Sequence, residues 1–235
     1  MTRAMRSAVI AAVVGAWCLG VGGAAQPSAS PVKILVLLDA GATMSWLTHL
    51  FLPPGVQPTG GSPAVESIKA AAAALGPNAS MRVATFGETF KVSATWERAS
   101  DALVSAVDNV VVEDRGRSPV WDAVYGGVDL LEATPDRRAI LLISSGRATG
   151  NVHGFDEALD RARLSRVVVH AACPSHGDSF PKTLDADNPN SPCARLKRLA
   201  DATRGRYSEP WVSRPQDREL ERFVADVVKD ASLGR

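Results

Sequence analysis

The segment Val32–Leu38 is an almost uninterrupted apolar run, and it ends against a single carboxylate, Asp39. A strand with apolar side chains on both faces must be covered on both faces, as the strands of a parallel α/β sheet are. A second run of this kind spans Ala139–Ile143. Because 46% of the residues are hydrophobic and 22% are charged, the chain can bury a core around such strands and is not disordered as a whole.

Strand and helix patterns alternate along most of the sequence, which favours a doubly wound, mostly parallel α/β sheet with helices on both faces. Gly87-Glu88 marks a turn between two strand patterns, which predicts an antiparallel hairpin at one edge of the sheet. We expect six strands in all, one of them antiparallel. Ligands of such sheets bind at the carboxyl ends of the strands, here after Leu38, Ile143 and Ala171. Strands are predicted at 32–38, 81–86, 90–96, 139–143, 166–171 and 206–208, and helices at 66–75, 100–107, 118–132, 155–164, 194–203 (ending at a C-terminal glycine, Gly205) and 217–230.

The beginning of the chain has the pattern of a secretory signal peptide. Arg3 and Arg6 precede an apolar run over Ala8–Gly23, and Ala24-Ala25 offers small residues for cleavage after Ala25. The run is short for a membrane span, which needs about 20 residues, so cleavage is favoured over an uncleaved anchor helix. We expect an exported protein, periplasmic or secreted. The predicted divisions are a signal peptide at 1–25, a short mature tail at 26–31 and one domain at 32–232.

Two cysteines remain in the expected mature chain, Cys173 and Cys193. In an oxidising compartment an even pair predicts a disulfide. Closing a loop of this size contributes about 3 kcal/mol to stability in the chain-entropy model. Two buried free thiols are the alternative, and a metal site is disfavoured because there is no CxxC or second Cys/His cluster. A lipid-bearing Cys18 is disfavoured by the bulky Trp17 before it.

The overall charge gives no sign of a polyanionic partner. The sequence has 26 Lys and Arg against 25 Asp and Glu, and loss of Arg3 and Arg6 with the signal peptide leaves a net charge of −1. No basic stripe is evident, so we expect neither nucleic acid nor an anionic membrane surface as a partner. We also expect no membrane span after signal cleavage.

Three short motifs lie where predicted strands or helices begin or end. They are Asp39-x-Gly41-x-Thr43-Met44, Ser118-Pro119-Val120-Trp121-Asp122-Ala123-Val124 and Leu141-Leu142-Ile143-Ser144-Ser145-Gly146. Their order and placement resemble the von Willebrand factor type A domain, whose metal-ion-dependent adhesion site combines Asp-x-Ser-x-Ser-Met, a Thr before a helix with Asp-Ala, and Thr-Asp-Gly after a strand. The resemblance extends from Pro31 to about Ser232 and includes a similar late helix and final strand over Leu196–Tyr207.

The resemblance implies a site for Mg²⁺ or Mn²⁺, which prefer an octahedron of oxygen ligands that water and an acidic group of the partner would complete. Asp39, Thr43 and Ser118 could supply oxygens. Gly41 lacks the hydroxyl of the family motif, and Ser145 stands in place of its second carboxylate, so we expect weak or absent metal binding. Asp39 would then accept hydrogen bonds from loop N–H and hydroxyl groups and hold the top of the sheet together.

The resemblance also implies a non-catalytic protein-binding module of the adhesion type, and we expect its partner to be another protein of the cell envelope. Trp46, His49 and Phe51 lie in a long Pro- and Gly-rich loop, where they either form an exposed partner patch or cover the helix beneath. Asp122 is interpreted as a charge that favours the start of a helix.

An enzymatic alternative is a haloacid-dehalogenase-like phosphohydrolase. Asp39 would be its nucleophile, and Ser144 would follow a later strand as in that class. However, Gly41 stands where the class has its acid–base aspartate, and covalent catalysis without that acid would be poor. The non-enzymatic interpretation is therefore favoured.

Overall fold

The computed structural model describes residues 30–41, 44, 63–93, 95–97, 116–174, 189, 191–210 and 218–233. Some sequence predictions fall outside these residues, namely the signal peptide at 1–25, the helix at 100–107, the ligand Thr43 and the patch of Trp46, His49 and Phe51. Among the helices that are described, none combines the length and the apolar character needed to cross a membrane.

Six strands form one mostly parallel sheet with an antiparallel strand at one edge, as the sequence predicts. The strands are β1 (Val32–Asp39), β2 (Ala79–Phe86), β3 (Phe90–Val92), β4 (Arg137–Ile143), β5 (Val168–Ala172) and β6 (Tyr207–Ser208). Their order across the sheet is β3-β2-β1-β4-β5-β6. The most apolar strand, β1, lies in the interior and pairs in parallel with β2 on one side and β4 on the other.

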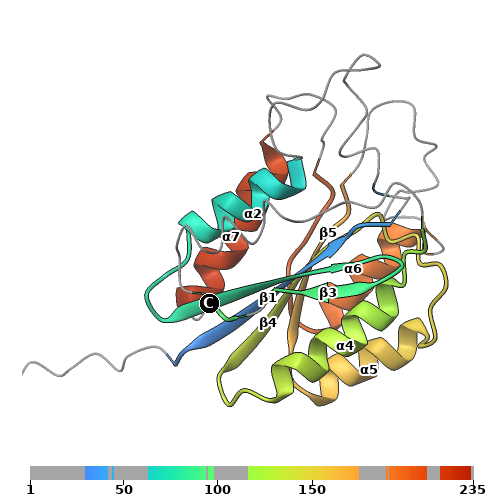
Figure 1. The fold of residues 1–235 in the computed structure, drawn as a ribbon, viewed down its shortest axis with the longest axis horizontal. Coiled ribbons are helices and arrows are strands. Elements are labelled where there is room, and N and C mark those ends of the chain that lie inside the picture. Colours follow the sequence, from blue (N-terminus) through green and yellow to red (C-terminus); the bar gives the residue numbers. More distant parts are fainter. Residues whose placement is uncertain are drawn as a thin grey trace, which may run out of the picture.

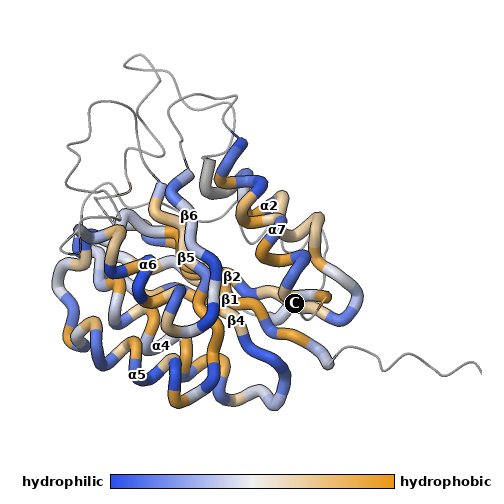
Figure 2. The backbone as a smooth tube through the Cα atoms, turned by 180° about the vertical axis from the view of Figure 1, so that it is seen from behind, coloured by the Kyte–Doolittle hydropathy of each residue, from blue (hydrophilic) through white to orange (hydrophobic). Residues whose placement is uncertain are grey.

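Different helices cover the two faces of the sheet. They are α2 (Pro63–Ala73), α4 (Val120–Glu132), α5 (Phe155–Leu164), α6 (Pro192–Ala202) and α7 (Glu219–Leu233). Because successive strand residues point to opposite faces, Val36 packs in the core with α2 and α7, whereas Leu37 packs with α4, α5 and α6. Figure 1 shows these two helical layers with the sheet between them. Figure 2 shows hydrophobic residues along the central strands, with hydrophilic residues recurring along the outer helices.

Three strands are shorter than the sequence predicts, and the smallest difference is at β6, which begins at Tyr207 and not at Arg206. β3 ends at Val92 and does not continue to Trp96. β5 begins at Val168 and not at Arg166, because the backbone of Arg166 is left-handed, with φ of 53°, and a strand requires negative φ. The central strands β1, β2 and β4 are each longer than predicted, so the shortening is confined to β3, β5 and β6.

Gly205 follows α6 as predicted, but it is not the residue that ends the helix in a left-handed conformation. Arg204 has that conformation, with φ of 63°. Gly205 is needed for a different reason, since a Cβ at this position would lie 1.9 Å from the carbonyl oxygen of Val169. The absence of a side chain allows the chain to pass directly against β5 on its way into β6.

The predicted disulfide is present. Cys173 follows β5, Cys193 lies in the first turn of α6, and their Cα atoms are 5.8 Å apart across a sequence separation of 20. Both cysteines are buried in the core beneath α4, α5 and α6. The bond therefore joins the end of a strand to the start of the helix that packs on it.

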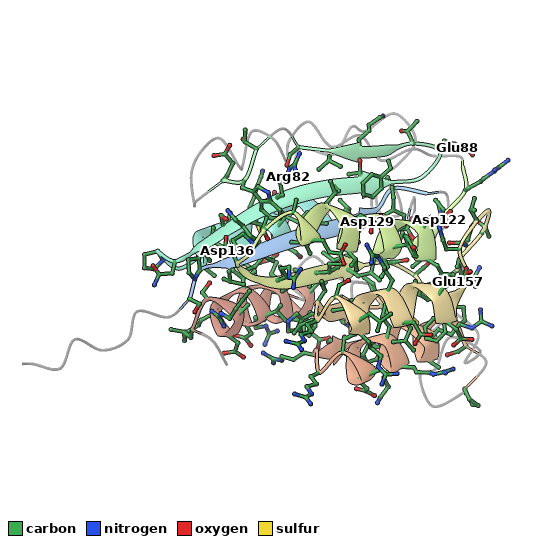
Figure 3. All side chains as sticks on the ribbon, turned by 90° about the horizontal axis from the view of Figure 1, so that it is seen from below. Arg82, Glu88, Asp122, Asp129, Asp136 and Glu157 are labelled. Atoms are coloured by element: carbon green, nitrogen blue, oxygen red, sulfur yellow. A yellow bond between two sulfur atoms is a disulfide. The ribbon has the colours of Figure 1, made fainter. Side chains whose placement is uncertain are left out.

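The connections diverge between β1 and β4, because the chain first builds the sheet outward through β2 and β3 and then continues on the other side through β4, β5 and β6. The carboxyl ends of strands at such a topological switch point are where ligands bind in open α/β sheets. Asp39 is the last residue of β1, and Ser144 directly follows β4. Figure 3 shows Asp122 at this end of the molecule and Asp136 at the opposite end.

Candidate functional site

Asp39 is buried at the switch point, with 1% of its surface exposed. Its Oδ1 accepts a hydrogen bond from the Gly41 N–H at 2.9 Å. Its Oδ2 accepts hydrogen bonds from the hydroxyl groups of Ser118 at 2.6 Å and Ser144 at 2.7 Å. The two serines lie 79 and 105 residues further along the chain, so one carboxylate joins the ends of β1 and β4 to the start of α4.

Burial raises the pKa of Asp39 above its ordinary value, because removal from water disfavours the ionised carboxylate. The hydrogen bonds from Ser118, Ser144 and Gly41 stabilise the ionised form and reduce the shift without cancelling it. Both carboxylate oxygens accept from protein donors, which is how a buried carboxylate is compensated for lost hydration. Asp39 therefore acts as a structural lock, by which we mean a buried carboxylate whose hydrogen bonds hold the ends of β1 and β4 and the start of α4 together.

Ser118 and the loop between β4 and α5 hold each other in place. The Ser118 N–H donates to Thr149 Oγ1 at 2.9 Å, and the Thr149 N–H donates to the Ser118 carbonyl oxygen at the same distance. Ser144 is held in a similar way, because its Oγ accepts a hydrogen bond from the Gly146 N–H at 3.0 Å. The hydroxyl donors of Asp39 are therefore themselves fixed by backbone contacts.

Asp122, in the first turn of α4, anchors the same loop. Its carboxylate accepts hydrogen bonds from the Val152 N–H at 2.8 Å and the His153 N–H at 2.7 Å, and it lies 2.9 Å from His153 Nδ1. Burial opposes ionisation, but these contacts outweigh it and hold the pKa of Asp122 below its usual value. The His153 ring also stacks on Tyr125, with ring centroids 4.0 Å apart. Asp122 thus has a role beyond that of a helix-start charge.

The anchored loop holds an apolar side chain out in solvent. Val152 is 86% exposed, although its backbone N–H is bound to Asp122. On the preceding side, Asn151 Oδ1 accepts a hydrogen bond from the Trp121 N–H at 2.8 Å. The position of Val152 is therefore fixed by its neighbours and not by burial of its own side chain.

Comparison with protein-family models gives no match, and comparison with curated proteins gives none either. Solved structures do match. A von Willebrand factor type A structure from Catenulispora acidiphila superposes with a TM-score of 0.59 at 15% identity, over 87% of this chain and 43% of that chain. The chain has the von Willebrand factor type A fold. Proximal thread matrix protein 1 from the mussel byssus gives a TM-score of 0.61 at 17% identity, over 87% of this chain and 47% of that one.

BatB from Bacteroides thetaiotaomicron is also similar to this chain, with a TM-score of 0.60 at 16% identity, over 86% of this chain and 99% of BatB. The chain thus spans about half the length of the Catenulispora and mussel proteins and nearly all of BatB. One structure of the mussel protein has zinc in its adhesion-site motif. The oxygen donors at the corresponding place in this chain therefore decide whether a divalent metal fits here.

The described residues at this place do not fit a divalent metal. Asp39 brings one carboxylate, and both of its oxygens are bound to protein donors. The carboxylate of Asp122 is bound to the loop at Val152 and His153. Ser145 is buried and brings no charge, and its Oγ accepts from the Arg147 N–H at 3.4 Å. Within the described ranges, no group of three or more His, Cys, Asp and Glu is arranged to hold a metal ion.

Gly41 departs from the family motif where the backbone leaves no room for a side chain. A Cβ at this position would lie 2.6 Å from the carbonyl oxygen of Arg117 and 3.1 Å from the Cβ of Ser118. Both distances are shorter than ordinary van der Waals contacts, so the family serine cannot be accommodated without moving the start of α4. The glycine that removes the family hydroxyl at position 41 is therefore also what allows the segment after β1 to pack closely against Arg117 and Ser118.

Restoring the family residue with Gly41→Ser should lower the free energy of unfolding by about 2 kcal/mol, as overpacking of a close-packed site does. Urea denaturation measures this change. Gly126→Ser is the matched control, because a Cβ there meets no atom within 4 Å, and in a helix serine should be about 0.5 kcal/mol better than glycine. A Gly41→Ser protein as stable as the control, with newly acquired Mg²⁺ binding, would show that the site is only a serine short of the family pattern.

Of the predicted site residues, the structure brings Asp39, Gly41 and Ser118 into direct contact, while Thr43 lies outside the described residues. Ser145 is adjacent, but it is Ser144 that reaches Asp39. The motif pattern gives Ser144 a role only in the enzymatic alternative, and no motif includes the loop residues Thr149 and Asn151. Their signal was the run of small polar residues and glycines after β4, which is typical of a loop that caps a neighbouring helix.

Proposed function

We propose that this type A fold is a protein-binding module that uses the carboxyl-terminal edge of its sheet and does so without a divalent metal. The observation that carries the proposal is the position of Val152, an exposed apolar side chain on a loop that Asp122 and Asn151 fix to the start of α4. A pre-ordered apolar contact at the switch point loses little conformational entropy when a partner covers it.

The metal-independent part of the proposal follows from Asp39. A bridging metal needs a carboxylate with free lone pairs facing the partner, whereas Asp39 is buried and bound to three protein donors. Partner recognition would then depend on shape and on apolar contact around Val152.

The predicted export of the protein supports the choice of partner. The predicted signal peptide would carry the protein out of the cytoplasm, into a compartment where the Cys173–Cys193 disulfide is stable. Similarity in fold to a matrix protein of the mussel byssus is consistent with a binding role outside the cell. We therefore propose a protein of the cell envelope as the partner.

The same geometry argues against the phosphohydrolase alternative. A nucleophilic carboxylate must reach a substrate phosphorus, but Asp39 is 1% exposed and its Oδ2 is bound to Ser118 and Ser144. We infer a non-catalytic protein. A screen against generic phosphomonoesters tests this inference, and turnover that disappears in Asp39→Asn would overturn it.

Val152→Asp should weaken retention of the partner from a cell-envelope extract at least about tenfold, since a charge would replace a central apolar contact. The matched control is Leu164→Asp, because Leu164 is 82% exposed and lies at the far end of α5. We expect the wild type and Leu164→Asp to retain the partner equally, with and without EDTA. We expect Val152→Asp to lose it. Retention that survives Val152→Asp would refute the proposed binding edge, and retention that EDTA abolishes would refute metal independence.

A further inference from the structure

A cavity of about 360 Å³ lies at the amino-terminal edge of the sheet, opposite the candidate site. Its lining includes four arginines, Arg137, Arg138, Arg166 and Arg204, and a single acidic residue, Asp136. Asp136 lies 3.9 Å from Lys33, which partly offsets its charge. The chain as a whole is almost neutral, so this concentration of positive charge results from folding and not from composition.

The arginines of this cavity differ in how they are bound. Arg137 is structural, since its guanidinium donates to the carbonyl oxygens of Ser30 and Ala231. The guanidinium groups of Arg166 and Arg204 have no hydrogen bond or ion pair with any residue in the described part of the chain. Both are thus donors that no described residue binds, and both line the same cavity.

Arg166 and Arg204 also have an unusual backbone. Among the described residues they are the two non-glycine positions with positive φ, 53° and 63°. Asparagine or glycine adopts this left-handed conformation at lower cost than arginine does. Each follows a helix and precedes a strand, and because β5 and β6 are parallel neighbours, the two turns lie at the same edge. Stability of the turns does not explain why both positions hold arginine, whereas a common ligand does.

A buried histidine also lines the cavity. His170 is 8% exposed and lines the cavity, and its Nδ1 accepts a hydrogen bond from the Arg206 N–H at 3.1 Å. A backbone N–H can only donate, so Nδ1 is unprotonated and the proton of the neutral ring is on Nε2. Desolvation, with the charge of Arg206, lowers the pKa of His170 to about 4, although Asp230 acts in the opposite direction. At neutral pH the ring therefore offers one N–H with no acceptor among the described residues.

We propose that this cavity, with Arg166, Arg204 and the Nε2–H of His170, is a binding site for a phosphate group carried on a compact organic body. Planar guanidinium groups pair with phosphate through two parallel hydrogen bonds each, and three phosphate oxygens use more donors than the two oxygens of a carboxylate. The volume exceeds that of a bare phosphate ion, and Val32 and Val168 provide an apolar wall for the organic part. The group could come from a soluble phosphomonoester or from a lipid headgroup.

The test uses the double variant Arg166→Asn/Arg204→Asn, which keeps residues that tolerate the left-handed backbone and removes both charges. Binding of inorganic phosphate and glycerol 3-phosphate is measured by calorimetry, and binding to vesicles that contain phosphatidic acid, whose headgroup is a phosphomonoester, by co-sedimentation. The control is Arg163→Gln/Arg195→Gln, which removes the same charge from two exposed helix positions that do not line the cavity. Thermal unfolding without ligand establishes that both variants are folded.

We expect saturable binding in one of the two organic arms, at least about tenfold weaker in Arg166→Asn/Arg204→Asn and unchanged in the control. Loss in the glycerol 3-phosphate arm identifies a soluble ligand, and loss in the vesicle arm alone identifies a lipid headgroup. No binding in any arm, or equal weakening by the control variant, would overturn the proposal. If the double variant is unfolded, His170→Phe gives the second measurement, with unchanged phosphate binding as the contradicting result.

Discussion

Replacing Asp39 by alanine should lower the free energy of unfolding by about 3 kcal/mol or more, since it leaves buried donors without an acceptor and each costs roughly 1–3 kcal/mol. Those donors are the Gly41 N–H and the hydroxyl groups of Ser118 and Ser144. The amide cannot turn away, and the two hydroxyl groups have no exposed surface through which to reach water. Urea denaturation at neutral pH measures the loss.

Asp160→Ala is the matched control for this change. Asp160 is exposed in α5, and no hydrogen bond or ion pair joins it to another described residue, so its replacement should alter stability by less than about 0.5 kcal/mol. If Asp39→Ala were as mild as the control, the carboxylate would not be a lock. The interpretation of Asp39 as a residue held available for metal would then regain support.

The protonation of Asp39 gives the same lock a pH signature. Because the folded-state pKa is raised, the folded protein holds this proton more tightly than the unfolded chain does. The resulting stabilisation is present below the ordinary carboxylate pKa and is lost as the pH rises through the raised folded-state value. Asp39→Asn cannot titrate, so the stability advantage of the wild type over Asp39→Asn should shrink as the pH rises from about 4 to about 8. An advantage that grows over this range would show that the hydrogen bonds outweigh burial.

Much of the fold can be predicted from the sequence because many positions of each central strand carry the same apolar signal. The runs at Val32–Leu38 and Ala139–Ile143 are apolar at every position needed for two covered faces, and the intervening helical patterns leave few topologies available. Prediction is weaker for the short β3 and β6, where two or three residues carry little pattern and the pairing is decided by tertiary contacts.

The side-chain contacts of the site could be predicted only in part. A motif places Asp39 and Ser118 near each other, but it does not determine which of the consecutive serines Ser144 and Ser145 faces inward, because that depends on where β4 ends. The contact of Asp122 with Val152 joins residues 30 positions apart, and the cavity lined by both Arg166 and Arg204 brings together turns about 40 positions apart. No local pattern encodes such contacts, because they follow from the register and packing of the finished sheet.

Removing the disulfide with Cys173→Ala/Cys193→Ala should lower the free energy of unfolding by about 3 kcal/mol, since the unfolded chain regains the entropy of an open loop of about 20 residues. The bond joins the end of β5 to the first turn of α6, and the neighbouring Pro192 carbonyl oxygen approaches Gly146 so closely that a Cβ there would lie 2.6 Å from it. The link therefore also fixes the helix against the loop that follows β4.

Reduction separates the effect of the bond from that of losing two sulfur atoms. In urea denaturation, dithiothreitol should lower the stability of the wild type by about the same 3 kcal/mol and leave the double alanine variant unchanged. Both cysteines are buried, so the variant should fall slightly below the reduced wild type, because two small cavities replace the thiols. Equal stability of the oxidised and reduced wild type would mean that the bond constrains nothing in the unfolded chain, and that packing alone holds α6 against β5.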